Sequence, residues 1–189
     1  FERFECRVDA DAAELGAIVE GWADEIRSAE RSFVYIHYMD VHSPYELRTP
    51  WLRLSPETEA ALDELVASDA WESCGGVAGE PPAIRPGKFL TALSEGRLPL
   101  SPEQAFEVVT AAYDNQVPYL DEHLRTLFER LEIGPETLVV FTSDHGEELA
   151  DHGAVGHPFS LYDELLHVPL FIRLPGAEAP RGRVAEPAS

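Results

Sequence analysis

Three short apolar runs, separated by long helical patterns, limit what this chain can fold into. They are SFVYIHYM at residues 32–39, TLVVFTS at residues 137–143 and HVPLFIRL at residues 167–174. Each run is rich in β-branched and aromatic residues and is shorter than an average helix, so each is predicted to be a strand. Their apolar character is nearly continuous, which predicts strands that are buried on both faces.

Helical patterns fill the segments between these runs. Apolar residues recur at helical spacing over residues 9–32, a second helix is predicted over residues 55–68, and the longest apolar stripe covers residues 101–131. Pro118 interrupts the longest stripe and is expected to kink or split the helix near Val117, because proline has no backbone N–H. Strands separated by such helices predict an α/β sandwich with a largely parallel sheet.

The composition fits one globular domain. The chain has 189 residues, of which 44% are hydrophobic, enough to bury a single core. Residues 71–89 hold the densest glycine and proline in the sequence, which predicts a long surface excursion. We therefore expect a single partial domain over residues 1–189, with residues 69–100 as a variable surface insertion.

The charge of the chain argues against two classes of partner. Thirty-five acidic residues against 14 basic ones give a formal net charge of −21, which disfavours binding to nucleic acid or to an anionic membrane. No apolar run approaches the roughly 18–20 residues that span a bilayer, so we expect no membrane segment in this chain. Cys6 and Cys74 lack a C-x-x-C spacing and are expected to be lone thiols.

Polar residues follow two of the predicted strands. Asp40 and His42 come after the first run, and Asp144 and His145 come directly after the second. Ligands of parallel α/β sheets bind beyond the carboxyl ends of the strands, so both clusters are expected to face one crevice.

The adjacent Asp144 and His145 can offer an oxygen and an imidazole nitrogen to one divalent cation, although a tight site needs further carboxylates from elsewhere. Gly146 then allows either a close backbone approach or a positive φ. In the alternative interpretation, SDHGEE is a helix start with Ser143 or Asp144 as its cap.

The other histidines differ in the roles that their positions favour. His157 lies between a glycine and a proline in a loop expected to cross the mouth of the sheet, where it can bind an anion or protonate a departing oxygen. For His42, in the loop after the first strand, a functional and a structural role are both open. Structural roles are favoured for three others: His37 and His167 as packed residues, and His152 as a residue that stabilises a loop.

Four blocks of the sequence together resemble a known family. In their order, they are similar to the later half of sequences of the sulfatase family, which belongs to the alkaline phosphatase superfamily. The blocks are FVYIHYMDVHSPY, YDNQVPYLDEHLRTLFERL, LVVFTSDHGEELADHG and GHPFSLYDELLHVPLFIRLPG. The resemblance implies an α/β/α sandwich with a mostly parallel sheet. It also implies hydrolysis of small-molecule or glycan sulfate esters, or of phosphate esters, at one divalent cation, commonly calcium, with Mg²⁺ or Mn²⁺ as alternatives.

The resemblance also assigns roles to four residues. Asp144 and His145 match the second pair of metal ligands of the family. His42, in the H-x-P block, matches a histidine that touches the anion or the leaving oxygen. His157 falls where many members have a lysine or histidine beside the bridging oxygen.

Two family segments have no counterpart in this sequence. They are an early Asp-Asp pair that completes the metal site and a Cys-x-Pro-x-Arg or Ser-x-Pro-x-Arg segment that supplies the nucleophile; neither Cys6 nor Cys74 fits it. We expect both to precede residue 1, which leaves the domain incomplete at its amino end and the isolated chain inactive. Two alternatives are a phosphoryl transferase or phosphodiesterase of the same superfamily and a non-catalytic remnant that acts in binding or assembly.

Overall fold

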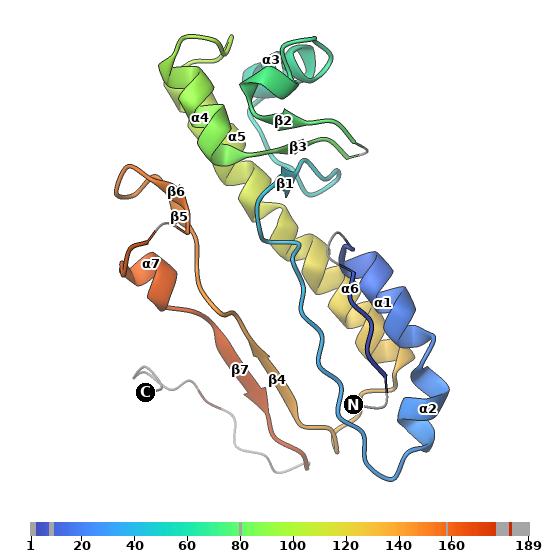
Figure 1. The fold of residues 1–189 in the computed structure, drawn as a ribbon. Helices are drawn as coiled ribbons and strands as arrows, with labels where there is room; N and C mark the ends of the chain where they lie inside the picture. The colour runs from blue at the N-terminus through green and yellow to red at the C-terminus, as the bar shows by residue number, and fades with distance from the viewer. Residues whose placement is uncertain (1–2, 8–9, 80, 158, 177–181, 183–189) are drawn as a thin grey trace. The chain divides into compact units, whose positions relative to one another are not determined.

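The computed structural model describes residues 3–7, 10–79, 81–157, 159–176 and 182 of the chain. It divides the chain into two compact units, Phe1–Leu131 and Glu132–Ser189, and each is described here by itself (Figure 1). Helices and strands are both present, which agrees with the predicted α/β class. No helix within the described ranges is both long enough and apolar enough to cross a bilayer.

Two consecutive helices run along the length of the first unit (Figure 1). Helix α5 covers Pro102–Asp114 and helix α6 covers Gln116–Arg130. Ser101 begins α5 with a capping box, in which its hydroxyl accepts the N–H of Gln104 at 3.2 Å and the Gln104 side chain accepts the N–H of Ser101 at 2.9 Å. The predicted split is confirmed, because Pro118 lies in the first turn of α6, where its missing N–H costs nothing.

The amino-terminal part of this unit contributes two helices where the sequence predicted one. Helix α1 covers Ala12–Glu20 and helix α2 covers Ala23–Ser28. The carboxylate of Asp11 caps α1 by accepting the N–H of Glu14 at 3.0 Å. Helix α1 packs against α6 around a small apolar cluster of Ala12, Tyr119 and Leu120.

The other end of the first unit combines short helices with a small sheet. Its helices are α3 (Pro56–Val66), the 3₁₀ turn η1 (Glu72–Cys74) and α4 (Pro86–Ser94). The strands are β1 (Tyr45–Glu46), β2 (Gly76–Val77) and β3 (Ala83–Ile84), which pair antiparallel in the order β1-β3-β2.

The segment over residues 71–89 is more tightly packed than its glycine and proline content predicted. Trp71, Ile84 and Phe89 are buried in the core of the first unit. A Cβ atom on Gly76 would lie 2.0 Å from the Trp71 ring, so only glycine fits under this side chain. Cys74 is a buried free thiol and Cys6 an exposed one, as expected for lone cysteines.

The second unit is built on a two-stranded antiparallel ladder. Strand β4 (Val139–Thr142) pairs with β7 (Leu170–Arg173), with Val139 opposite Arg173 and Thr142 opposite Leu170. Both strands were predicted from the sequence. Their predicted burial is wrong for the residues that the structure describes, since Phe171 and Ile172 are 65% and 55% exposed.

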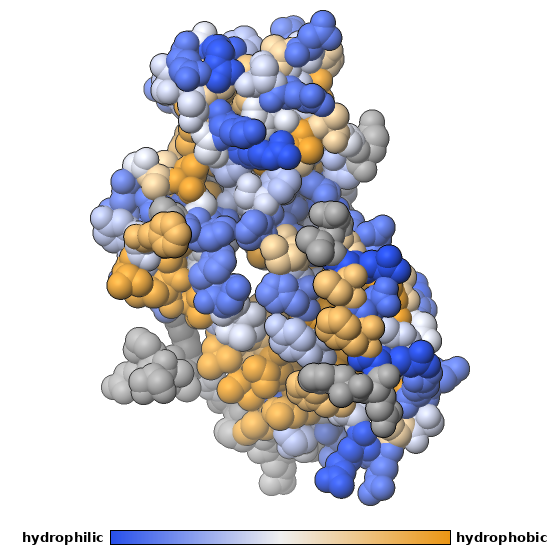
Figure 2. All heavy atoms as spheres, viewed as in Figure 1, coloured by the Kyte–Doolittle hydropathy of each residue, from blue (hydrophilic) through white to orange (hydrophobic). Residues whose placement is uncertain are grey.

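The first predicted strand is absent from the structure. Residues 32–39 are not part of any strand in the described parts of the chain, and Phe33 and Tyr35 are 75% and 72% exposed. Figure 2 shows apolar residues at the surface along β4 and β7. The described strand pairs are all antiparallel, so the mostly parallel sheet of an α/β/α sandwich stays a prediction.

The rest of the second unit consists of a hairpin and a short helix. Strand β5 (Glu148–Leu149) pairs antiparallel with β6 (Val155–Gly156), and α7 covers Asp163–Leu166. We refer to residues 148–156 as the 148–156 hairpin. It follows the Asp144–His145 pair and precedes His157, so its geometry decides how these residues meet.

Candidate active site

Asp144 and His145 follow directly after β4, as the sequence predicted. The Nδ1 atom of His145 lies 2.7 Å from the carbonyl oxygen of Gly146. A carbonyl oxygen only accepts, so Nδ1 carries the proton, and Nε2 has the lone pair with which a neutral imidazole binds metals. Nε2 lies 3.9 Å from Oδ1 of Asp144. Two ligand atoms that share one cation at about 2.0–2.6 Å are separated by roughly 3–4 Å, so this pair has a suitable spacing.

Gly146 is required by a close backbone approach. Its N–H donates to the carbonyl of Leu165 at 2.9 Å, and a Cβ atom built on it would lie 1.8 Å from the carbonyl oxygen of Glu164. Its φ is not positive. Of the two roles that the sequence left open for this glycine, the close approach is therefore the one observed.

The alternative interpretation of SDHGEE as a helix start is wrong. The segment after Asp144 is irregular and leads into strand β5. The Asp144 carboxylate accepts the N–H of His145 at 3.1 Å, and the Ser143 hydroxyl donates to the carbonyl of His145. These bonds hold the turn that places the Asp144–His145 pair at the end of β4.

A buried carboxylate organises the 148–156 hairpin. Glu148 is almost completely buried, and its Oε1 atom accepts the N–H groups of His152 and Ala154 at 3.2 and 3.1 Å. The turn is closed by a bond of 2.8 Å from the N–H of Ala150 to the carbonyl of Ala154, and Ala150 and Gly153 have φ values of 75° and 83°. The Glu148 carboxylate therefore fixes the turn from inside.

The register of the hairpin brings His157 back to the metal-ligand candidates. Glu148 is opposite Gly156, so the next opposing positions are Glu147 and His157. Nδ1 of His157 lies 3.3 Å from Oε1 of Glu147, and the His157 ring lies 4.3 Å from the His145 ring, tilted by 33°. Asp144, His145 and His157 thus form one cluster within the second unit.

His42 belongs to the first unit. Its Nδ1 atom donates to the carbonyl of Ser43 at 2.7 Å, and its N–H donates to the carbonyl of Met39 at 2.9 Å. The convergence of His42 with Asp144 and His145 in one crevice stays a prediction. Asp40, expected beside His42 in that crevice, is buried instead and accepts the N–H of Ala12 at 2.9 Å.

The sequence pattern did not predict a charged cluster around Arg48 in the first unit. The buried guanidinium of Arg48 lies 2.7 Å from Glu46, 3.4 Å from Asp11 and 3.7 Å from Asp40, and 3.6 Å from the centre of the Tyr119 ring. Burial raises the pKa of Asp40 and of Glu46, although Arg48 opposes both shifts. This cluster ties the segment after His42 to helices α1 and α6.

At Asp11 the balance goes the other way. Burial raises its pKa, but the hydrogen bond of 2.6 Å from Tyr119, the N–H of Glu14 and the charge of Arg48 together outweigh burial, so the pKa is lowered. The pKa values of neighbouring carboxylates in this cluster are therefore shifted in opposite directions.

A second group of possible metal ligands was also missed. Ligand atoms of Glu148, His152 and Glu164 lie within 4.8 Å of one another and could hold a divalent cation. His152 Nδ1 also lies 2.6 Å from Glu164 Oε1, and its ring stacks on Tyr162 at 3.6 Å. These contacts agree with the loop-stabilising role that the sequence favoured for His152. The sequence pattern did not predict that His152 lies close to Glu148 and Glu164, because this proximity arises from the fold of the hairpin.

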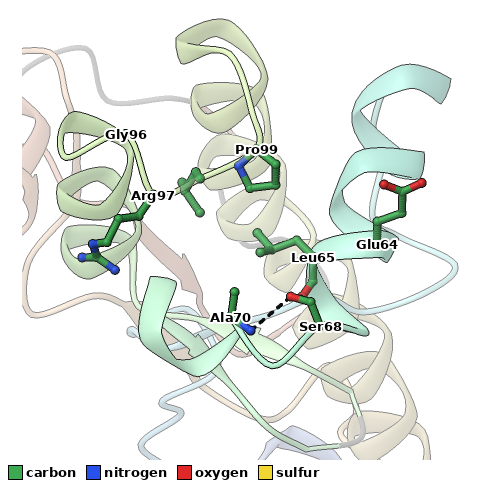
Figure 3. A pocket seen from close by; sticks show the side chains of 8 residues that line it. Glu64, Leu65, Ser68, Ala70, Gly96, Arg97 and Pro99 are labelled. Carbon is green, nitrogen blue, oxygen red and sulfur yellow. Dashed lines mark hydrogen bonds between the residues drawn. The ribbon is translucent and has the colours of Figure 1, made fainter.

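The pocket in Figure 3 is separate from these residues. It lies in the first unit, where Leu65, Ser68, Arg97 and Pro99 are among the residues that line it. Arg97 is engaged there with Glu95 at 2.6 Å and with the carbonyl of Ser73 at 2.7 Å. None of the four residues assigned from the sequence lines this pocket.

The comparison with protein families shows the family of the chain. The family model described as Sulfatase matches residues 16–189. The chain belongs to the sulfatase family. The resemblance found in the four sequence blocks is thereby confirmed, and with it the place of this sulfatase-family chain in the alkaline phosphatase superfamily.

Curated relatives match the chain over different lengths. It is 34% identical over 82 residues to iduronate 2-sulfatase of Mus musculus, which is 42% of the chain and 15% of the relative. It is 35% identical over 74 residues to iduronate 2-sulfatase of Homo sapiens, or 38% of the chain and 13% of the relative. The multifunctional alkaline phosphatase superfamily protein PehA of Trinickia caryophylli is 26% identical over 170 residues, covering 85% of the chain and 32% of PehA. The sulfatase-family chain thus spans less than a third of the length of each of these relatives.

Proposed function

We propose that this sulfatase-family chain forms part of an enzyme that hydrolyses sulfate esters of small molecules or glycans with a divalent cation. The observation that supports this most directly is the cluster in the second unit. An oxygen and a nitrogen ligand lie 3.9 Å apart there, and the imidazole of His157 lies 4.3 Å from that of His145. The names of the iduronate 2-sulfatase relatives support a sulfate ester as substrate.

Asp144 and His145 would hold the cation. The proton on Nδ1 of His145 and the bond to the Gly146 carbonyl leave Nε2 in the form that binds metals, so the donor set fits. Calcium is the first candidate, with Mg²⁺ and Mn²⁺ as alternatives, since sulfatases generally use a divalent metal. When bound, such a cation neutralises charge on an oxygen of the transferring group.

The two histidines would act on the ester itself. We assign to His157 the protonation of the departing oxygen, because its ring adjoins the metal-ligand pair and imidazole exchanges protons near neutral pH. We assign to His42 a hydrogen bond to the anion or to the leaving oxygen, on the basis of its H-x-P block. Because Nδ1 of His42 donates to the Ser43 carbonyl, this hydrogen bond would come from Nε2–H of the protonated imidazole.

The remaining parts of the site would come from residues outside this chain. Two ligands are too few for a tight site, and no segment of the sequence matches the nucleophile motif of the family. We propose that a preceding portion of the same domain supplies both and completes an α/β/α sandwich. The exposed apolar side chains of β4, β7 and residues 32–39 support this, because the added sheet and helices would cover them. The isolated chain is then inactive.

One observation favours a second candidate function. PehA matches 85% of the chain and is described as a multifunctional alkaline phosphatase superfamily protein. A phosphodiesterase or phosphoryl transferase of this superfamily would use the same metal-ligand pair and the same two histidines. A non-catalytic binding or assembly role is the third alternative, and it requires no metal at Asp144.

Turnover by the complete protein distinguishes these possibilities. Hydrolysis of an aryl sulfate and an aryl phosphate is compared for the wild type, Asp144→Ala, His145→Ala and the control His167→Gln, whose exposed side chain lies outside the cluster. We expect sulfate hydrolysis to fall by at least about 100-fold in the first two variants and to persist in the control. Preferred hydrolysis of the phosphate would favour the second candidate. Undiminished turnover in Asp144→Ala would refute the proposed site.

A further inference from the structure

The carboxylate of Glu147 lies next to His157 because of the register of the 148–156 hairpin. Glu148 pairs with Gly156, which places Glu147 and His157 at the following cross-strand position. Side chains alternate between the two faces of a strand. The buried Glu148 therefore faces the interior turn, while Glu147 and His157 occupy the opposite face, where His145 also lies against the His157 ring.

The two side chains differ in their freedom to move. The Glu147 side chain is 5% exposed, whereas the His157 side chain is 41% exposed. A carboxylate that is held on nearly all sides has few rotamers available, so its oxygen is a fixed reference point. The exposed imidazole, in contrast, can rotate about χ2 unless a partner holds it.

The contact involves one defined nitrogen of the imidazole. Nδ1 of His157 lies 3.3 Å from Oε1 of Glu147. An ionised carboxylate only accepts hydrogen bonds, so Nδ1 is the donor. The bond therefore fixes both the tautomer and the rotation of the ring, and it determines the direction in which Nε2 points.

We infer that Glu147 is a positioning residue for His157. It holds Nδ1–H of the ring in place beside the His145 imidazole, so that Nε2 is presented to the leaving oxygen. In the acid step the imidazolium gives its Nε2 proton to that oxygen and returns to the neutral Nδ1–H form. This inference rests on the proposed function for its catalytic consequence, although the orientation itself is a property of the protein without substrate. Glu147 does not touch the reacting atoms in this arrangement.

The first test reads the imidazole directly. Histidine nitrogen shifts are measured by NMR in the complete protein with ¹⁵N-labelled histidine, using His157→Gln to assign the signals. We expect Nδ1 of His157 to be protonated in the neutral ring of the wild type. In Glu147→Ala the ring should change to the Nε2–H tautomer that imidazole prefers in water. Glu147→Gln should keep the wild-type tautomer, because its amide oxygen can still accept from Nδ1.

A matched control separates orientation from general damage. Glu164→Gln alters the carboxylate that contacts His152 in the same unit. It should change the signals of His152 and leave those of His157 in place. An unchanged tautomer of His157 in Glu147→Ala would overturn the inference, whatever substrate the protein uses.

Kinetics then test the catalytic consequence. If the wild type hydrolyses an aryl sulfate, Glu147→Ala should lower kcat by about 10-fold with little change in KM, and Glu147→Gln should restore most of the loss. An equal loss in both variants, or a loss confined to KM, would overturn the positioning role. A wild type without turnover would instead count against the proposed function, while the NMR result would still decide the orientation of His157.

Discussion

The imidazole rings of His145 and His157 lie 4.3 Å apart, although twelve positions separate them in the sequence. The 148–156 hairpin makes this contact possible, because its register returns the chain to the end of β4. A metal-ligand candidate and an acid candidate are thereby held in one cluster before any substrate binds. Such preorganisation is what hydrolysis at a metal centre requires of a protein scaffold.

Replacing Gly146 by alanine should destabilise the second unit. The new Cβ atom would lie 1.8 Å from the carbonyl oxygen of Glu164, and a backbone atom cannot move aside cheaply. We expect a loss of about 2 kcal/mol in the free energy of unfolding. Urea denaturation of the complete protein measures this loss. Gly134→Ala is the matched control, since its nearest neighbour would lie at 3.7 Å; equal stability of the two variants would contradict the observed backbone approach.

Arg48→Met should be more harmful than the loss of a surface arginine. Asp40, Glu46 and Asp11 would lose the cation that compensates their charge, and breaking a buried ion pair costs about 3–5 kcal/mol. Arg125→Met removes an exposed pair with Glu129 and should cost less than about 0.5 kcal/mol. Thermal denaturation of both variants provides the comparison. Similar melting temperatures would show that the Arg48 cluster contributes little.

Replacing Asp40 and replacing Asp11 should change the pH dependence of stability in opposite directions. The folded-state pKa of Asp40 is raised by burial, so its ionisation weakens the fold as the pH rises from the unfolded value through the folded one. In Asp40→Asn, the free energy of unfolding relative to the wild type should therefore increase from about pH 4 to pH 7.

The pKa of Asp11 is lowered, so its stabilising effect is present above the unfolded pKa and is lost as the pH falls. The difference between Asp11→Asn and the wild type should accordingly become more negative as the pH rises through the acidic range. Urea denaturation at several pH values measures both variants. Slopes of the same sign would contradict the two assigned shifts.

The sequence predicted strands β4 and β7 correctly because their apolar runs are bounded by clear glycine, proline and polar residues. It also predicted the break between α5 and α6, since Pro118 acts through local backbone chemistry. Residues 32–39 have the same composition as a buried strand but form none. The hydropathy of a segment indicates that it tends to be buried. It does not specify which part of the protein would pair with the segment or cover it.

The sequence also supplied candidate site residues, and their roles stay predictions. Adjacent polar residues at a strand end pointed to Asp144 and His145, and the motif resemblance added His42 and His157. The contact of Glu147 with His157 could not be predicted, because it depends on the hairpin register and on the positive φ of Ala150, a residue type that rarely adopts it. The Arg48 cluster joins segments far apart in the chain, and no local pattern encodes such a meeting.

The exposed apolar surface of β7 predicts that one substitution has a small effect in the isolated chain and a large effect in the complete protein. Phe171 is 65% exposed in this chain, so Phe171→Glu should change the stability of the isolated chain by less than about 0.5 kcal/mol. Exposed apolar strands favour self-association, so we expect the isolated wild-type chain to associate and the variant to associate less. In the complete protein, where we propose that this surface is covered, the same change should cost about 3–5 kcal/mol. Light scattering and denaturation measure the two effects. A harmless change in the complete protein would argue against a covering layer.

The most direct test is a crystal structure of the complete protein grown with calcium and an inorganic sulfate. We predict anomalous density for one cation within about 2.3–2.6 Å of an Asp144 oxygen, with Nε2 of His145 as a neighbouring ligand. His157 should lie on the sulfate side of that ion. A cation bound instead at Glu148, His152 and Glu164, with none at Asp144, would contradict the proposed active site.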